Sequence, residues 1–237
     1  MEIRDASALV TGAGRGIGRS IALALAREGA HVTVVSRTAP ELDTLVSEIK
    51  AVGGRGVAFA GDLRSASACA GAVAAAVECF AGLQILVNNA GLGVFANVAD
   101  TSDEDWDAVL GTNLTAAFRL TRAALPHLAL RGGHVLMVSS LAGKNPIAGL
   151  AAYSASKAAL DQFAACLMLE VRHQGVKVTT VAPGSVDTSF AGARSPSDTS
   201  WMLSAEDVAQ TVVELLKMRD GAHSSRVEMR PARPQKR

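Results

Sequence analysis

Short apolar runs alternate with longer segments rich in alanine and leucine along most of the chain. The short runs show little polar alternation, which is typical of strands that are buried on both faces of a sheet. We expect these strands at 7–13, 31–37, 57–63, 83–90, 133–140, 176–184 and 225–230. The longer segments have helical character and lie at 16–29, 40–53, 65–82, 102–130, 151–175 and 205–218.

The regular alternation of strand and helix predicts an α/β fold. We expect one Rossmann-type, doubly wound parallel sheet of about seven strands, with right-handed crossovers and helices on both faces. The chain has no internal repeat, low-complexity linker or change in composition, so one domain over residues 1–237 is expected. Ligands of such sheets bind at the carboxyl ends of the strands, and the residues just after each strand are therefore the first candidates for a site.

Several helix ends carry recognisable signals. Thr101 with Glu104 fits a capping box at the start of one helix, and Ser204 with acidic residues after it fits the start of the last helix. Gly29 and Gly175 fit helix ends, where glycine accepts a left-handed conformation.

Composition and charge exclude several classes of function. The net charge is +1 and 49% of the residues are hydrophobic, so we expect neither a nucleic-acid-binding nor a membrane protein. The three cysteines (Cys69, Cys79 and Cys166) form no C-x-x-C pair, and no histidine lies at ligand spacing. We therefore expect reduced thiols and no metal site. The first residues also lack the apolar run of a signal peptide, so a cytoplasmic location is expected.

A glycine-rich stretch, TGAGRGIG, follows the first predicted strand. Gly12, Gly16 and Gly18 allow a tight turn and a close backbone approach, and the helix that follows presents free N–H groups to an anion. The spacing is G-x-x-x-G-x-G, longer than the common G-x-G-x-x-G fingerprint. Arg15 adds a positive charge that a plain turn does not need. The stretch therefore predicts a phosphate site, although a turn without a ligand is the alternative.

The end of the second strand indicates which nucleotide binds. A carboxylate there would favour NAD, but this chain has Ser36 and Arg37. Arginine suits a 2′-phosphate through forked, charge-assisted hydrogen bonds. Since no acid at this strand end competes with Arg15 and Arg37, the sequence favours NADP(H). At the third strand end, Asp62 is a candidate acceptor for the adenine amino group.

Tyr153, the only tyrosine, precedes Lys157 by one helical turn. Residues four apart share a helix face, so the ammonium is expected beside the phenol, where it would lower the phenol pKa. Moving that pKa from ~10 to ~7 requires about 4 kcal/mol, which one charge at about 4 Å supplies at an effective dielectric near 20. Tyr153 is therefore a candidate proton donor or acceptor, and a packed helix residue is the alternative.

Six motifs in order make the chain resemble the short-chain dehydrogenase/reductase family over essentially its whole length. They are TGAGRGIG, NNAG (88–91), GTNLTAAF with Asn113, S-x-x-G from Ser140, Y-x-x-x-K from Tyr153, and PGSVDT (183–188). The resemblance implies an NADPH-dependent oxidoreductase that reduces a ketone to an alcohol.

The resemblance also implies roles for individual residues. Tyr153 would be the general acid or base, and Ser140 would bind the substrate oxygen, with Ser139 as the alternative polar partner. Lys157 would lower the Tyr153 pKa and hold the nicotinamide ribose, and Asn113 would keep a water in a proton relay. The implied cofactor-binding residues are Gly12, Arg15, Gly16, Ile17, Gly18, Ser36, Arg37, Asp62, Leu63, Asn89, Ala90, Gly91, Tyr153, Lys157, Pro183, Gly184, Val186 and Thr188.

The sequence is less informative about the substrate, which is expected to be a small carbonyl or alcohol compound. We expect the loop at 189–203, with Phe190, Trp201, Met202 and Leu203 as apolar anchors, to select it. A 3-oxoacyl thioester is one candidate class, and sepiapterin-type or diketone reduction is an alternative. An NADP(H)-binding sensor or scaffold without turnover is the alternative of another class. The family resemblance further implies a homodimer or homotetramer that assembles through the helices carrying Asn113 and Tyr153.

Overall fold

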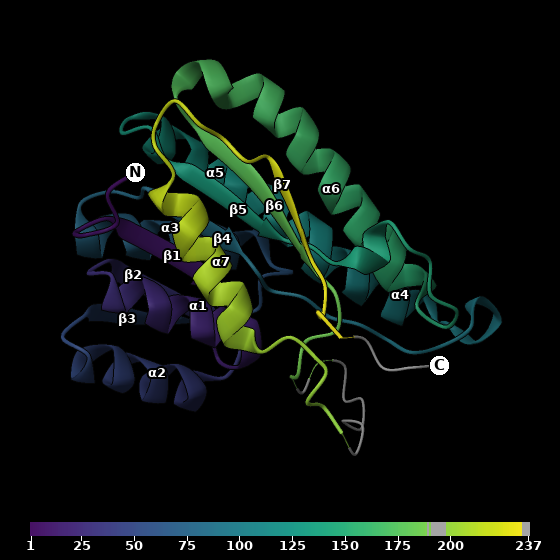
Figure 1. The fold of residues 1–237 in the computed structure, drawn as a ribbon. Helices are drawn as coiled ribbons and strands as arrows, with labels where there is room; N and C mark the ends of the chain where they lie inside the picture. Colours follow the sequence, from purple (N-terminus) through teal and green to yellow (C-terminus); the bar gives the residue numbers. More distant parts are fainter. Residues whose placement is uncertain (189, 191–197, 234–237) are drawn as a thin grey trace.

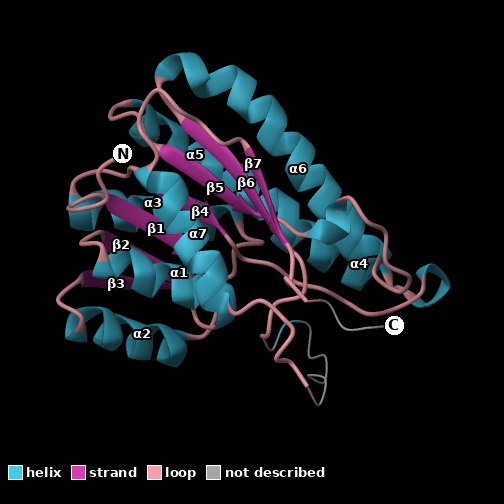
Figure 2. Ribbon diagram, viewed as in Figure 1, coloured by secondary structure: helices cyan, strands magenta, loops and turns pink. Residues whose placement is uncertain are grey.

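One parallel sheet organises the computed structural model, which describes residues 1–188, 190 and 198–233. Over these residues the sheet has seven strands in the order β3-β2-β1-β4-β5-β6-β7, and each neighbouring pair is parallel. The strands form the middle layer of the molecule, between two layers of helices (Figures 1 and 2). The predicted α/β, doubly wound sheet is confirmed.

The strands lie where the apolar runs predict them, with small differences at the ends. Their bounds are β1 (Ser7–Thr11), β2 (His31–Ser36), β3 (Arg55–Ala60), β4 (Ile85–Asn88), β5 (His134–Val138), β6 (Lys177–Pro183) and β7 (Arg226–Met229). The four central strands β1, β4, β5 and β6 are buried almost throughout, as expected for strands covered on both faces. β3 begins earlier than predicted because it pairs along the whole length of β2.

Two hydrophobic cores, one on each face of the sheet, hold the layers together. One packs α1 (Gly16–Arg27), α2 (Ala39–Ala51) and α7 (Ala205–Lys217) against the sheet. The other packs α3 (Ala66–Phe80), α5 (Ala116–Ala129) and α6 (Ala151–Val171) against the opposite face. The apolar residues of the central strands β1, β4, β5 and β6 therefore have a covering layer on each face, which explains their near-continuous hydrophobic runs.

The segment 102–130 differs from the single helix predicted there. It contains α4 (Asp103–Leu110), a π-helical turn (Gly111–Thr115) and then α5. The predicted Thr101–Glu104 box is wrong: Ser102 caps α4 and accepts from the Asp105 N–H at 3.1 Å. Ser204 does form a capping box, with Asp207, and Gly29 and Gly175 have φ values of 90° and 76° after their helices.

The order of the strands places the site. The chain leaves β1 in one direction for β2 and β3, and then crosses to the other side of β1 to form β4. The loops after β1 and β4 therefore diverge to opposite faces of the sheet, and a crevice opens between them.

His134 makes the fold sensitive to acid. It is 3% exposed at the start of β5, within 2.9 Å of Thr179 Oγ1, and the ring of His223 lies 6.1 Å away. Burial, with His223 adding to it, lowers the His134 pKa to about 3. In the unfolded chain, His134 has a pKa near ~6.5 and binds a proton below that pH. In the folded chain, His134 stays neutral until the pH is much lower.

We expect stability to fall as pH drops below about 6.5, with His134 alone contributing about 2 kcal/mol of that loss at about pH 5. Thermal denaturation of the wild type and His134→Gln between neutral pH and pH 5 measures this. The variant should be less stable at neutral pH but should lose less on acidification. Equal acid losses in both proteins would contradict the assignment.

Candidate active site

A cavity of about 580 Å³ opens at the carboxyl ends of the central strands. Its walls come from the turn after β1 and the ends of β2, β3, β4, β5 and β6, together with α6. Most residues predicted from the sequence line it. They are Gly12, Arg15, Gly16, Ile17, Ser36, Arg37, Asp62, Leu63, Asn89, Ala90, Gly91, Ser140, Tyr153, Lys157, Pro183, Gly184, Val186 and Thr188. Gly18 and Asn113 are not among the lining residues.

The turn after β1 is held by contacts that only glycine permits. Gly12 has φ +62°, and an added Cβ there would lie 2.8 Å from the Ala90 Cα. A Cβ on Gly18 would collide with the Asn89 side chain and the Gly12 carbonyl. Gly18 therefore lets the turn close on the segment after β4.

Asn89, directly after β4, holds this turn through hydrogen bonds. Its Nδ2 donates to the carbonyls of Thr11 and Gly12 at 2.9 and 3.2 Å, and the Thr11 hydroxyl accepts from the N–H groups of Asn89 and Ala90. The NNAG segment thus has a structural role in addition to lining the cavity.

An acidic residue of α2 reaches the cavity wall close to the end of β2. Glu41, in the first turn of α2, lines the cavity with Ser36 and Arg37. A Cβ on Gly14 would collide with Glu41 Oε2 and would lie 3.1 Å from Ser36 Oγ. The wall nearest Ser36 therefore carries both signs of charge, because Glu41 reaches it from α2.

Asp62 lines the cavity after β3, but its carboxylate is already engaged. Arg64 contacts both carboxylate oxygens, at 2.6 to 3.2 Å, and also donates its backbone N–H to Oδ1. This hydrogen bonding holds the Asp62 pKa below its usual value. Asp62 is therefore a permanently charged acceptor over the physiological range.

Lys157 lies at the buried end of the cavity. The residue is 3% exposed, and its ammonium donates to the Val138 carbonyl at 2.8 Å. Burial lowers the Lys157 pKa to about 8, and the charge of Asp161 acts in the opposite direction. Lys157 thus remains an ammonium at neutral pH and can lose its proton in mild alkali.

The Tyr153 phenol has a higher pKa than expected. The Lys157 Nζ lies 5.7 Å from the ring centroid. Burial raises the Tyr153 pKa and is the largest effect, while a hydrogen bond with the Ser140 side chain lowers it. The expected lowering by Lys157 is therefore corrected: loss of hydration outweighs the stabilisation of the phenolate, and Tyr153 holds its proton at neutral pH.

Both serines after β5, Ser139 and Ser140, line the cavity. Ser140 precedes the short helix η3 (Leu141–Gly143), where its Oγ accepts from the Ala142 N–H at 3.1 Å, and its side chain lowers the pKa of Tyr153 against the effect of burial. Ser139 is 3% exposed and turns back to the Lys157 carbonyl at 3.4 Å. The geometry favours Ser140 over Ser139 as the partner of a substrate oxygen.

Asn113 lies in the π-helical turn and is 1% exposed. Its Nδ2 donates to the Leu92 carbonyl and to Ser156 Oγ, both at 2.9 Å, and its Oδ1 accepts from the Leu92 N–H at 2.7 Å. Both amide hydrogens are thus used inside the protein. The contacts anchor the Leu92 loop, which lines the cavity, and leave only one lone pair of Oδ1 for a water.

The predicted substrate loop divides between two places. Ser189 and residues 191–197 lie outside the described residues. The Phe190 ring lies 5.3 Å from the Tyr153 ring and lines the cavity. Trp201, Met202 and Leu203 line a separate open groove beside α7.

The sheet is doubly wound, its first turn is rich in glycine, and one cavity at the carboxyl ends of its strands is lined by Ser140, Tyr153 and Lys157. This combination defines an α/β oxidoreductase. The family model described as short chain dehydrogenase matches residues 6–199. The chain therefore belongs to the short-chain dehydrogenase family.

Curated relatives cover this chain to different extents. An uncharacterised oxidoreductase of Staphylococcus aureus is 31% identical over 230 residues, which are 97% of this chain and 98% of the relative. The ketoacyl reductase HetN of Nostoc is 38% identical over 179 residues, and the match spans 75% of this chain and 62% of HetN. The glycine betaine reductase ATRR of Emericella nidulans is 32% identical, but this chain spans only 18% of its length.

Solved structures resemble the chain over almost all of its length. A metagenomic short-chain oxidoreductase in complex with NADP has a TM-score of 0.87 and 35% identity, covering 99% of this chain and all of that one. A short chain dehydrogenase from Burkholderia cenocepacia, also with NADP, has a TM-score of 0.89 and 33% identity, with 97% of each chain covered. Among the described residues of the present protein, no helix is long and apolar enough to cross a bilayer.

Proposed function

We propose that this chain is an NADP(H)-dependent oxidoreductase that reduces a ketone to an alcohol, with Tyr153 as the general acid. The observation that carries the proposal is that Ser140, Tyr153 and Lys157 line the same nucleotide-sized cavity, with the Lys157 Nζ 5.7 Å from the centroid of the Tyr153 ring. The NADP found in two close structural relatives supports the choice of cofactor.

The residues of the cavity fit a dinucleotide phosphate. The glycine turn presents backbone at places where a Cβ would collide, and it leads into the N-terminus of α1, which favours an anion. Arg15 and Arg37 line the same region. We propose that these two arginines and Ser36 hold the 2′-phosphate, that Asp62 and Leu63 bind the adenine, and that 183–188 binds the nicotinamide.

The protein would supply the proton of the reaction. When bound, NADPH supplies the hydride that reduces the carbonyl carbon. Tyr153 would donate its phenol proton to the carbonyl oxygen, which suits a group whose pKa is raised by burial. The Ser140 hydroxyl would donate a hydrogen bond to the same oxygen and stabilise its developing charge.

Lys157 would support this transfer electrostatically. Below a pH of about 8 its ammonium offsets the negative charge that forms on Tyr153 as the proton leaves. We propose that Asn113 positions other groups. Its hydrogen bonds to Leu92 fix a wall of the cavity, and the remaining lone pair of its Oδ1 can hold a relay water.

We propose a 3-oxoacyl thioester as one class of substrate. The name of HetN, a ketoacyl reductase, favours 3-oxoacyl thioesters. Phe190 beside Tyr153 provides an apolar surface, which would equally suit diketones or sepiapterin-type substrates. A sensor or scaffold that binds NADP(H) without turnover is the competing class, but it has no need for Ser140, Tyr153 and Lys157 in this arrangement.

NADPH oxidation against a panel of ketones, diketones, 3-oxoacyl thioesters and pterins tests the proposal. We expect turnover on at least one class, with the alcohol as product. Tight NADPH binding without oxidation by any member of the panel would favour the sensor.

We propose the reducing cytoplasm as the location. The three free cysteines in the described structure, two of them exposed, accord with it.

We also propose a homodimer or homotetramer built on α5 and α6. Phe118 on α5 is 42% exposed and contacts Phe163 of α6, while Leu169 on α6 is 60% exposed. Light scattering at micromolar concentration should give a mass of two or four chains, and Phe118→Glu with Leu169→Glu should lower it. A monomer in the wild type would refute this assembly.

A further inference from the structure

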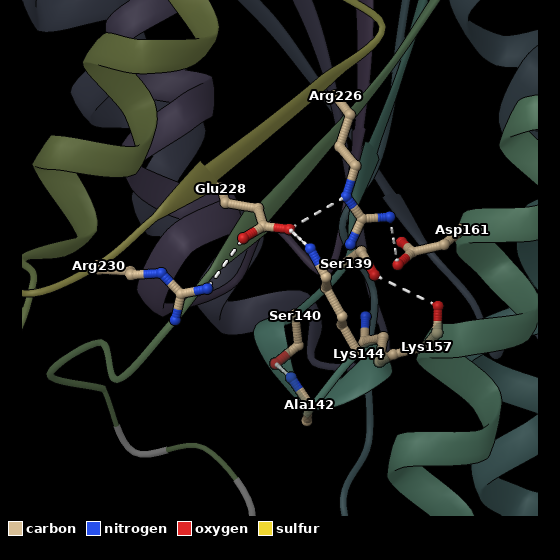
Figure 3. A network of polar contacts seen from close by, with 9 residues as sticks. All are labelled: Ser139, Ser140, Ala142, Lys144, Lys157, Asp161, Arg226, Glu228 and Arg230. Carbon is tan, nitrogen blue, oxygen red and sulfur yellow. Dashed lines mark hydrogen bonds and ion pairs between the residues drawn. The ribbon is translucent and has the colours of Figure 1, made fainter. Parts of the chain in front are cut away.

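Five charged side chains form one connected network beside the candidate active site (Figure 3). Glu228 of β7 accepts from Lys144 Nζ at 3.1 Å and from Arg230 at 2.9 Å, and lies 3.5 Å from Arg226 Nε. Arg226 in turn donates to Asp161 Oδ2 at 2.8 Å. The network thereby joins the segment after η3, the edge strand β7 and helix α6, although Asp161 and Arg226 are 65 positions apart.

Asp161 is the member of the network that lies on the same helix as Tyr153 and Lys157. It follows Lys157 by four residues on α6, so the two side chains share a helix face. Its side chain is 11% exposed. Arg226 engages Oδ2, whereas Oδ1 is buried and has no hydrogen-bond partner among the described residues. A buried carboxylate with one free oxygen exerts a strong field on nearby charges because little water screens it.

Lys157 is the cation on which this field acts. Its ammonium is buried and donates to one neutral acceptor, the Val138 carbonyl, which compensates only part of the lost hydration. Asp161 is the one charged group that raises the Lys157 pKa against the effect of burial.

The other charged groups on the elements packed against α6 have no such effect on Lys157. Lys144, after η3, is exposed and paired with Glu228, and Lys177, at the far end of β6, is paired with Asp220. Arg172 and His173 follow the distant end of α6. The acidic residues of α4 are Asp103, Glu104, Asp105 and Asp107.

We propose that Asp161, held in place by Arg226 of β7, is a positioning residue that keeps the Lys157 ammonium charged inside the cavity. Asp161 touches neither substrate nor cofactor in this account and acts only through Lys157. Arg226 has two effects: it fixes the carboxylate in place and partly neutralises it. This inference rests on the proposed function for its catalytic meaning, but its electrostatic content can be measured without a substrate.

Lysine NMR tests the proposal directly, because the chain has only six lysines. With lysine labelled by ¹³C at Cε, the Lys157 signal is the one that disappears in Lys157→Arg. We expect Asp161→Asn to lower the Lys157 pKa by about 0.5 to 1 unit. We expect Arg226→Gln to raise it by a smaller amount, because Asp161 loses its counter-ion and a cation is removed.

The Lys157 pKa is expected to fall in Asp161→Asn and to rise in Arg226→Gln. These opposite shifts distinguish the proposal from a merely structural role of the ion pair. Both substitutions break the same ion pair, so general loosening of β7 would move both variants in one direction. Glu170→Gln removes one negative charge from the exposed far end of α6 and should leave the Lys157 pKa unchanged. If Asp161→Asn does not fold, Asp161→Ser replaces it in the same measurement, with the same expected fall in the Lys157 pKa.

A Lys157 pKa that is equal in the wild type, Asp161→Asn and Arg226→Gln would overturn the proposal. With a working substrate, the alkaline limb of the kcat–pH profile should move with the NMR value in each variant. Shifts in NMR without turnover on any substrate would refute the proposed function and leave this inference standing. Turnover without any shift of the Lys157 pKa would overturn this inference and leave the proposed function standing.

Discussion

Replacing Tyr153 with phenylalanine should lower kcat by roughly 10²- to 10⁴-fold, since it removes the proton donor from the reaction. The aromatic ring stays, so the contact with Phe190 and the shape of the cavity are kept. The hydroxyl is lost together with its hydrogen bond to Ser140. NADPH affinity, measured by fluorescence titration, should change only a few-fold, because most of the nucleotide wall lies at β1 to β4.

Ser154→Ala provides the matched control for this variant. It removes a hydroxyl from the next residue of the same helix, and that hydroxyl lines no part of the cavity described here. We expect kcat within a few-fold of the wild type. Turnover by Tyr153→Phe close to that of Ser154→Ala would show that another group delivers the proton.

Arg37→Asp should have the second-largest effect, on cofactor choice. A charge-assisted hydrogen bond to a 2′-phosphate contributes about 1.5–3 kcal/mol, and an acid in its place adds repulsion. We therefore expect the Kd for NADPH to rise about 100-fold, while the Kd for NADH changes little or falls. The wild-type preference for NADPH should be moderate, because Glu41 lies on the same wall as Arg37.

Arg219→Asp makes the same change of charge at an exposed residue away from the cavity. It should leave the Kd values of both nucleotides unchanged, which controls for the change in net charge. If Arg37→Asp weakened NADPH and NADH equally, Arg37 would be acting on a part common to both nucleotides, and the 2′-phosphate assignment would be wrong.

The fold and the outline of the site are predictable from local patterns. Apolar runs such as SALVT, followed by helical segments, specify strands covered on both faces, and the carboxyl ends of those strands point to one edge. Gly12 and the Tyr153–Lys157 pair could be recognised because their chemistry depends on short spacing in the sequence. The family assignment made from the six motifs is confirmed by the match over residues 6–199.

Features that depend on tertiary packing were not predictable in this way. Glu41 looks like an ordinary first-turn acid of α2, and only the fold of the β1 turn brings Gly14 against it. The π-helical turn at Asn113 is a change in backbone hydrogen bonding that leaves no clear pattern of side chains. The raised pKa of Tyr153 comes from burial by several elements at once.

The most direct test of the central claim follows the transferred hydrogen. NADPH carrying two deuterium atoms at C4 of its nicotinamide, the carbon that gives up the hydride, is incubated with the protein and the most reactive carbonyl of the panel. The account predicts one deuterium on the carbinol carbon of each alcohol formed, one NADPH oxidised per alcohol, and loss of both in Tyr153→Phe. Tight NADPH binding with no labelled alcohol from any carbonyl class would contradict it.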